Sequence, residues 1–534
     1  MVARIAGVLY LVAHVVLFWL KPGHYMAAEV GLQLGLLLPA LLFGLAQERR
    51  HTGLPTRGLL DQRQSGIPGW ALAVCLLVFT LGGTAVSRVV TSGRVNGDEL
   101  AYVFQSRIFA SGHITAPAPP ASVFYEHHVI RDGRWFTQFP PGWPALLALS
   151  SAAHLEAETN ILLGLATLAI VFLTARELYA EREARVALFL MLFSPFFWGN
   201  CLGRMSHPLC GCLLAGSAYF YFRTRREGSL WALAGALACI VAAIQVRPLT
   251  GALFGLVLGL SSVWEARHCR RRLLETVALG GLFAAAAVVC CGAYNLATTA
   301  VFTKFPYASS SGRSIPLELI ADPSIAARNL RWGLLTTWVF SFPLLFPAAG
   351  YAVLRDREKR GESVVLALLF FGLVAGYAPD RYSSGSFLGE RFYFEGFFAV
   401  SLLAARGLTL LTQDRGAWRP AGWLGPLAAS SVATLLFTLP VIFHEVKPYA
   451  EVRLAAERVK LSNAVVFLQP HDPEFVAKHF NLNRADWPSG PLFFAPDPGP
   501  DARPAIARAL GRPAWVVITY DPSLQKAQVS ETSP

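Results

Sequence analysis

Long apolar runs recur along most of the chain, each bounded by Arg clusters, Pro or Gly. A helix of about 20 apolar residues crosses the roughly 30 Å hydrocarbon core of a membrane. The pattern therefore predicts a polytopic α-helical membrane protein with about 13 transmembrane helices. They are expected near residues 4–20, 26–46, 70–90, 160–178, 186–203, 208–222, 230–246, 249–264, 273–297, 333–354, 364–379, 393–411 and 423–443.

The apolar segment 142–155 is short for a span and is predicted to be an interfacial helix that does not cross the membrane. With that assignment, the loops fall into two sets on opposite sides of the membrane. One set is shorter in total length, yet it carries more Lys and Arg than the other. The side with the denser positive charge is expected to be cytoplasmic. This places the N-terminus in the cytoplasm and the loops 91–141 and 298–332 outside.

The tail after residue 443 changes character and is also expected outside. Short apolar runs at 464–468, 491–495 and 514–520 alternate with helical patterns near 449–462, 473–480 and 501–510. Alternating strands and helices predict a small α/β domain. We therefore divide the chain into a membrane domain, 1–443, and a small extramembrane domain, 444–534, with a structural or acceptor-docking role.

Composition agrees with a membrane protein, because 54% of residues are hydrophobic and only 15% are charged. These values argue against a soluble enzyme and a disordered chain. The net charge of +12 lies mainly in short loops between apolar runs, where it sets topology, so nucleic acid is not an expected partner. Seven of the eight cysteines lie in apolar runs, and no disulfide framework is visible.

Chemistry-bearing residues gather on the predicted outer face. Asp98 and Glu99 follow the third span, where a carboxylate held in a cleft serves as general base or cation ligand; the alternative is a pair of solvated loop acids. Pro140, Pro141 and Gly142 open the interfacial helix and are in themselves a structural element. The segment 126–128 (EHH) could ligate a metal, although a solvated loop is the more common arrangement.

Single arginines stand at the outer ends of spans: Arg204, Arg247 and Arg391, the last within the segment GERFYFEG. Arginine at a membrane face binds phosphate bidentately, whereas the alternative is snorkelling to lipid headgroups. Arg247 is the most informative of the three, since it lies between two apolar runs with no loop to solvate it.

The order of these motifs resembles the GT-C superfamily of membrane glycosyltransferases over roughly residues 86–411. An acidic pair in the first large outer loop, an interfacial PPG helix, an Arg-bearing outer turn and a late ER-F-Y segment carry the likeness. In pattern the chain looks most like protein O-mannosyltransferases and the transferase that adds aminoarabinose to lipid A.

The resemblance implies a hexosyl- or pentosyltransferase that uses a polyprenyl-phosphate-linked sugar and a glycan, lipid or protein acceptor. Asp98 matches the family's acidic base and Glu99 its neighbour. Arg247 and Arg391, with Arg204, match positions that face the lipid phosphate; Pro140, Pro141, Gly142 and Tyr393 match structural or substrate-loop positions. Direct displacement would invert the anomeric centre, and no general acid is required because polyprenyl phosphate is a good leaving group.

The chain departs from the family in three places. Two helices precede the usual first span, Gln138 stands where relatives often have Lys or His, and His207 stands where several carry an acid. No metal site is therefore assigned, although a divalent cation is one possible cofactor. By analogy, the expected location is a bacterial inner membrane with a periplasmic active site and C-terminal domain, the endoplasmic reticulum being the alternative.

Two other classes of function compete with a transferase. A membrane transporter or lipid-linked-sugar flippase would place ionisable groups near the midplane and show inverted repeats. Acids within the predicted spans are few, Glu29 and Glu275 among them, and no repeat is evident. A non-catalytic scaffold for the tail would make Asp98 and the outer arginines dispensable.

Overall fold

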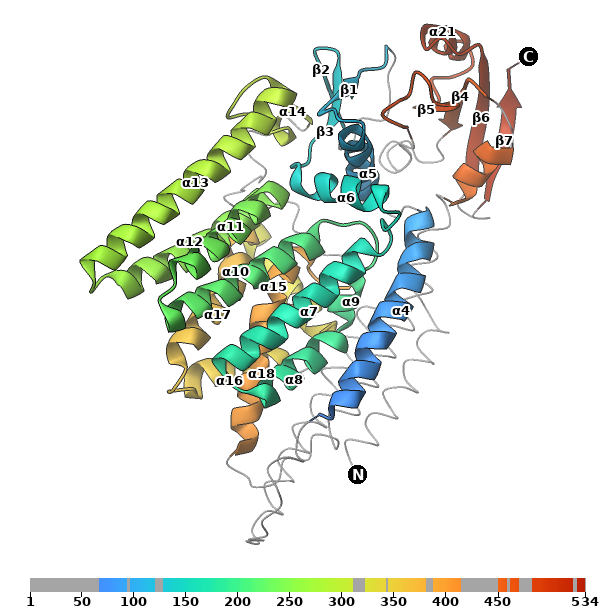
Figure 1. Ribbon diagram of the computed structural model, residues 1–534. Helices are drawn as coiled ribbons and strands as arrows, with labels where there is room; N and C mark the ends of the chain where they lie inside the picture. The colour runs from blue at the N-terminus through green and yellow to red at the C-terminus, as the bar shows by residue number, and fades with distance from the viewer. Residues whose placement is uncertain are drawn as a thin grey trace, which may run out of the picture.

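The computed structural model describes residues 67–93, 97–120, 128–310, 322–341, 344–380, 388–413, 450–458, 462–469, 483–521 and 526–533. Most of the described chain forms a bundle of long helices (Figure 1). Six described helices are long and apolar enough to cross a membrane, or seven if one bent pair is a single span. The spans expected at 4–20, 26–46 and 423–443 lie outside the described residues.

The bundle helices follow the predicted apolar runs closely. They are α4 (Gly69–Gly93), α7 (Thr159–Leu178), α8 (Glu181–Leu192), α9 (Pro195–Cys201), α10 (His207–Glu227), α11 (Leu230–Val246), α12 (Pro248–Ala266), α13 (Arg270–Thr299), α15 (Pro323–Val339), α16 (Leu345–Arg355), α17 (Arg360–Tyr377) and α18 (Phe397–Gln413), the last preceded by the 3₁₀ helix η3 (Arg391–Gly396). A short helix, α14 (Tyr307–Ser310), follows α13.

Two segments expected as continuous helices are each divided. The run 186–203 forms α8 and α9, which meet at 66°. Ser194 caps α9 by accepting a hydrogen bond from the Phe197 N–H, and Pro195 occupies its first turn, where a missing N–H costs nothing. The run 333–354 belongs to α15 and α16, and Pro347 lies in the first turn of α16. Proline thus favours a new helix start within an unbroken apolar run.

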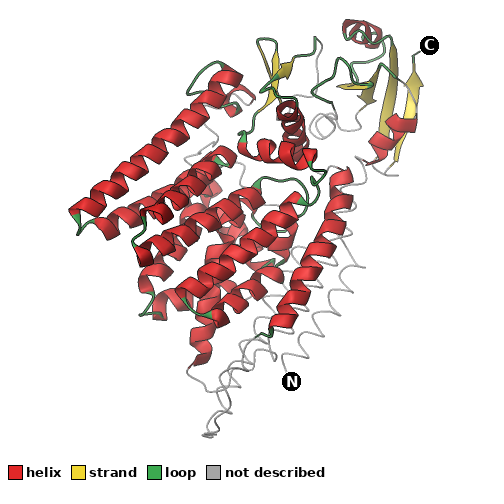
Figure 2. Cartoon of the chain, in the orientation of Figure 1, coloured by secondary structure: helices red, strands yellow, loops and turns green. Residues whose placement is uncertain are grey.

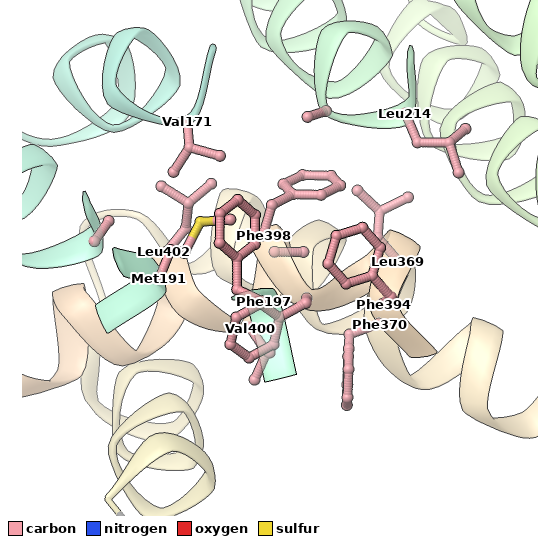
Figure 3. Packing of buried hydrophobic residues seen from close by; sticks show 14 of the residues in the cluster. Val171, Met191, Phe197, Leu214, Leu369, Phe370, Phe394, Phe398, Val400 and Leu402 are labelled. Carbon is pink, nitrogen blue, oxygen red and sulfur yellow. The ribbon is translucent and has the colours of Figure 1, made fainter. Parts of the chain in front are cut away.

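The bundle core is apolar and draws on most of the helices. Figure 3 shows Val171 of α7, Met191 of α8, Phe197 of α9, Leu214 of α10 and Phe394 of η3 converging on one region. Outward-facing apolar side chains are also abundant, including Leu77 and Leu81 on α4 and Leu282, Val288 and Val289 on α13. Such exposure is unfavourable in water and typical of lipid-facing helices, so the chain is a multi-pass membrane protein.

The segment 91–141, expected as an outer loop, is largely structured. It contains helix α5 (Gly97–Ala110) and a three-stranded antiparallel sheet of order β1-β3-β2: β1 (Ala116–Pro117), β2 (His128–Arg131) and β3 (Arg134–Thr137). The difference arises because α5 is buried by distant parts of the chain, as described below. These elements lie at the upper end of the bundle in Figure 1, and the strands of the described chain all lie there too (Figure 2).

Helix α6 (Gly142–Ala152) follows β3 and corresponds to the predicted interfacial segment. Its 11 residues reach roughly 16 Å, too short to cross a bilayer, and it lies across the upper end of the bundle (Figure 1). Its first residue, Gly142, touches the end of α11: a Cβ there would stand 2.8 Å from the Gln245 carbonyl oxygen. Only glycine permits this approach.

The C-terminal part contains a four-stranded sheet of order β5-β4-β6-β7. Strands β4 (Ala464–Gln469), β5 (Leu492–Pro496) and β6 (Ala514–Asp521) are parallel, whereas β7 (Lys526–Thr532) pairs antiparallel with β6. Helix α21 (Arg503–Ala509) and the helical residues 450–458 accompany it. Strand β7 was not expected from the sequence, and the expected helix 473–480 lies outside the described residues.

Helix α5 packs against both the bundle and this sheet. Ala101 and Tyr102 belong to the bundle core. Leu100 packs with residues of the sheet and of helix 450–458, whereas Phe104 and Ile108 join the core on the other side of the sheet. The helix that carries Asp98 and Glu99 is therefore fixed from two sides by apolar burial.

Candidate functional site

Asp98 and Arg391 are neighbours although 293 positions separate them in the sequence. Asp98 lies in the first turn of α5, and Arg391 begins η3. A guanidinium nitrogen of Arg391 donates a hydrogen bond to Asp98 Oδ2 at 3.3 Å. Both side chains keep some exposure, 14% for Asp98 and 28% for Arg391, so a ligand can reach them.

Glu99 points elsewhere and is buried. Its Oε1 accepts the backbone N–H of Arg204 at 3.0 Å, and Gly203 next to it has a φ of +81°. A Cβ at Gly203 would lie 2.5 Å from that oxygen. Burial raises the pKa of Glu99 above its ordinary value, while the Arg204 hydrogen bond and charge act in the opposite direction. Glu99 thus holds the turn between α9 and α10.

Arg247 lies between α11 and α12 in a cluster of polar side chains. Its Nε is 2.9 Å from Glu395 Oε1, and other guanidinium nitrogens approach His207 Nε2 at 3.5 Å and the Tyr377 hydroxyl at 3.4 Å. Glu395 is fully buried, and the same Oε1 lies 2.9 Å from His207 Nδ1. Tyr377 is in turn hydrogen-bonded to Thr250 at 2.7 Å.

The ring of Phe392 joins the two arginines. The guanidinium carbons of Arg247 and Arg391 lie 4.9 and 5.3 Å from its centroid, within the range of cation–π attraction. Tyr377 stacks on Phe392 at 4.8 Å with 8° between the ring planes. The structure therefore brings Asp98, Arg247 and Arg391 into one cluster. Arg391 contacts the partly exposed Asp98 carboxylate, and Arg247, on the same aromatic ring, contacts the buried Glu395 carboxylate.

Other predicted residues lie outside this cluster. Arg204 pairs with Glu156 at 3.0 Å, and its carbonyl oxygen accepts from the Trp143 indole at 2.7 Å. Tyr393 is fully buried against α15, where a Cβ on Gly333 would lie 2.7 Å from its ring. The contacts of Arg204 and Tyr393 therefore hold neighbouring elements together.

The proline element borders a small cavity between α6, α11 and α13. Pro140 and Pro141 line it together with Gln138, Tyr294 and Tyr307. Phe139 links this wall to the acidic helix, since its ring lies 4.4 Å from that of Tyr102 on α5. The element therefore positions α5 and α6 relative to each other.

Glu395, Tyr377 and Phe392 were not singled out from the sequence. Glu395 and Phe392 lie within the same segment as Arg391, and Glu395 follows it by about one helical turn. The sequence signal that could have identified Glu395 is its position as an acid within the predicted span 393–411. Within the described residues, no group of three or more His, Cys, Asp or Glu could hold a metal ion, and Glu126 and His127 lie outside them.

Comparison with solved structures identifies the fold as that of GT-C membrane glycosyltransferases. ArnT from Cupriavidus metallidurans, bound to undecaprenyl phosphate, matches at a TM-score of 0.56 and 14% identity, over 85% of this chain and 94% of that one. Its apo state matches at 0.53 with the same identity and coverage. At this identity the likeness establishes the fold alone.

A more distant likeness is found to the archaeal oligosaccharyltransferase AglB from Archaeoglobus fulgidus, in complex with an inhibitory peptide and a dolichol-phosphate. Its TM-score is 0.48 at 12% identity, over 84% of this chain and 70% of that one. No protein-family model and no curated protein matches the sequence.

Proposed function

We propose that this chain is a membrane glycosyltransferase that moves a sugar from a polyprenyl-phosphate-linked donor to an acceptor hydroxyl. The observation that carries the proposal is the cluster of Asp98, Arg391 and Arg247 around Phe392. It supplies a partly exposed carboxylate in contact with one guanidinium group and a second guanidinium group on the same aromatic ring, on a fold shared with a protein crystallised with undecaprenyl phosphate.

In the proposed reaction, the acceptor oxygen attacks the anomeric carbon while the bond from that carbon to the donor phosphate oxygen breaks. The acceptor proton passes to the Asp98 carboxylate, and the departing polyprenyl phosphate keeps the electron pair. The sugar would be transferred with inversion, because one displacement occurs. Arg391 and Arg247 stabilise the charge that develops on the phosphate, the kind of preorganised electrostatic contribution that typically lowers such barriers most.

The surroundings of the two acids support different roles. Asp98 is partly exposed, as a base that meets substrate requires, and its contact with Arg391 orients the carboxylate. Glu99 is buried and already accepts a backbone N–H, so we assign it a positioning role.

The site would lie on the outer face of a bacterial inner membrane. The Lys and Arg asymmetry of the loops supports a cytoplasmic N-terminus and a periplasmic location for residues 444–534. We propose that 1–443 is the membrane transferase domain and 444–534 a small α/β domain. The donor would carry a hexose or pentose, and the acceptor would be a glycan, lipid or protein.

The proposal is tested by binding of undecaprenyl phosphate to the purified protein in detergent. Arg247→Ala should weaken binding at least about tenfold, since a charge-assisted hydrogen bond contributes about 1.5–3 kcal/mol. Arg247→Lys keeps the charge but loses the planar guanidinium group, so its affinity for undecaprenyl phosphate should lie between those of wild type and Arg247→Ala. Arg508→Gln, an exposed arginine of α21, is the charge-matched control and should bind like wild type.

Unchanged binding in Arg247→Ala would leave the ion pair with buried Glu395 as the role of Arg247 and remove the donor site from this cluster. Transport is the competing activity. Movement of a lipid-linked sugar across proteoliposomes, with no sugar transferred to any acceptor, would favour the flippase instead.

A further inference from the structure

A second cavity, of about 960 Å³, lies away from the Asp98 cluster. Three parts of the chain form its walls: the C-terminal end of α5, the strands β1 and β3, and residues 484–486 of the C-terminal part. Many of its lining residues are small, including Ala110, Ser111, Ala116 and Gly133. A volume of this size admits a ligand of two or three sugar units.

The cavity is lined by three arginines and one acid. Arg484 is paired with Asp486 through two hydrogen bonds, at 2.9 and 3.0 Å. Arg134 donates to the Ala297 carbonyl oxygen at 3.3 Å, and the Arg107 side chain makes no hydrogen bond or ion pair with any described residue. Within the described part of the chain, these two positive charges therefore line the cavity without a carboxylate in direct contact.

Arg107 and Arg134 are half-buried, whereas Arg484 is exposed. Burial is the main cause that lowers the pKa of Arg107, and the charges of Arg484 and Arg204 act in the same direction, against Glu156 and Asp486. Cations gathered in a partly buried site repel one another, and an anion bound between them relieves that repulsion. The cavity thus favours a ligand with negative charge.

The walls of the cavity are tied together. The Trp487 indole donates to the Pro117 carbonyl oxygen at 3.1 Å, which joins the C-terminal part to β1. Phe104 and Ile108 of α5 share a core with β4, β5 and β6. A preformed site loses little entropy when it binds a ligand.

Asp98 and Arg107 lie near opposite ends of α5, separated by roughly 14 Å along the axis and about two and a half turns. They therefore lie on opposite faces of one helix. A ligand in the cavity therefore does not occupy the reacting position at Asp98. An extended acceptor that passes around α5 could contact both the cavity and Asp98.

We propose that this cavity binds an anionic sugar unit of the acceptor, one that carries a phosphate or a carboxylate, between Arg107 and Arg134. This inference rests on the proposed function, because it assigns the bound sugar to the acceptor. It gives the C-terminal part a direct role, since residues 484–486 supply one wall.

The test uses the full-length protein in neutral detergent and three probes: glucose 6-phosphate, glucuronate and glucose. Each is titrated with and without saturating undecaprenyl phosphate, so that binding at the donor site is recognised. Glucose 6-phosphate or glucuronate should bind at least about tenfold more tightly than glucose, with affinity that falls as salt rises. A preference for the phosphate points to a phosphorylated headgroup glycan, and a preference for glucuronate points to a uronic-acid glycan.

Three variants locate the binding. Arg107→Gln and Arg134→Gln should each weaken binding of the charged sugar about tenfold. Ala110→Trp, at an exposed position of the lining, should block the cavity without removing charge. Arg508→Gln, outside the cavity, should change nothing, and thermal unfolding verifies that each variant is folded.

Equal affinity for glucose and the charged sugars, or affinity that survives both Arg107→Gln and Ala110→Trp, would overturn the inference. The proposed function has a separate test, which is whether the wild-type protein binds undecaprenyl phosphate. Donor binding without sugar-anion binding removes only the cavity assignment, whereas the reverse result leaves an anion site and removes the transferase proposal.

Discussion

Arg247 Nε lies 2.9 Å from Oε1 of Glu395, a carboxylate that is fully buried in the bundle. Charge on Arg247 is therefore balanced before any donor arrives. A donor phosphate must share this guanidinium with Glu395, and the guanidinium's remaining nitrogens, near His207 and Tyr377, are held at longer distances of 3.5 and 3.4 Å. Glu395 fixes the guanidinium, and the longer contacts are those that a phosphate would replace.

Glu395→Gln should destabilise the protein without donor, by about 3–5 kcal/mol, because it leaves the buried charge of Arg247 without its partner. Added undecaprenyl phosphate should restore part of that loss by supplying a negative charge. The measurement is thermal unfolding with and without the lipid. The shift on lipid addition should be larger in Glu395→Gln than in wild type; equal shifts would mean that the phosphate does not meet Arg247.

Asp98→Asn should lower transfer by about 10²–10⁴-fold, because it keeps the shape of the side chain and removes its proton affinity. Glu99→Gln should do less harm, since the amide oxygen can still accept the Arg204 N–H. The measurement is single-turnover transfer from a lipid-linked sugar to an identified acceptor. Reversed severities would exchange the two roles, and full activity in both variants would remove the reacting centre from α5.

Gly142→Ala should reduce donor use, because the new Cβ would force α6 away from Gln245, which lies close to Arg247 in the sequence. Gly280→Ala is the matched control: it lies in helix α13, with nothing within 4 Å of the added Cβ, and should be neutral or stabilising by about 1 kcal/mol. Donor affinity and thermal unfolding are measured on both. Equal effects of the two substitutions would argue against a role for the close approach of α6 and α11.

Cysteines introduced at Ala153 and Ala180, which flank α7, should be labelled from opposite sides of the membrane. Ala153 and Ala180 are both exposed, and Ala180 directly precedes α8. Ala153→Cys should react with an impermeant reagent from outside, and Ala180→Cys only after permeabilisation. The exposed native residues Cys269 and Cys290 are first replaced by Ser. Labelling of both sites from one side would contradict the spanning assignment of α7. Labelling of Ala180→Cys from outside and of Ala153→Cys only after permeabilisation would contradict the interfacial assignment of α6.

The C-terminal sheet should loosen in acid. Arg503 holds Asp497 through two hydrogen bonds of 2.7 Å, which lower the pKa of that carboxyl below its ordinary value. A carboxyl with a lowered folded-state pKa stabilises the fold above its unfolded value, about 3.9, and this contribution is lost as the pH falls through the folded value. Hydrogen exchange of β6, corrected for its intrinsic pH dependence, should be faster at pH 3 than at pH 6. Asp497→Asn should reduce that difference; an unchanged difference would exclude this pair as its origin.

The sequence predicted the parts of the fold whose signal is local. Long apolar runs located the described spans within a few residues, and the proline pair located the start of α6 at Gly142. Short apolar runs between turn residues located β4, β5 and β6. In each case hydrophobic patterning or turn chemistry acts within one element.

Features set by distant contacts were missed. The sequence around α5 was interpreted as the start of an outer loop. Its apolar residues Leu100, Phe104 and Ile108 pack mostly against the C-terminal part of the chain, which a local pattern does not show. The position of Glu395 beside Arg247 likewise depends on the packing of η3 against α10 and α17. The three residues Asp98, Arg247 and Arg391 were selected for their type and expected side of the membrane, but only the folded chain shows Phe392 between the two arginines.

Helix α5 also limits how this protein can be shortened. A chain that ended before residue 450 would lose the core partners of Leu100 and most partners of Phe104 and Ile108. The helix that carries Asp98 would then expose an apolar face to water. Water would then compete for the turn that orients the carboxylate, and exposed apolar surface would promote aggregation. The membrane bundle and the C-terminal sheet are therefore joined by the packing of α5, and swapping the sheet between related chains would require exchanging α5 with it.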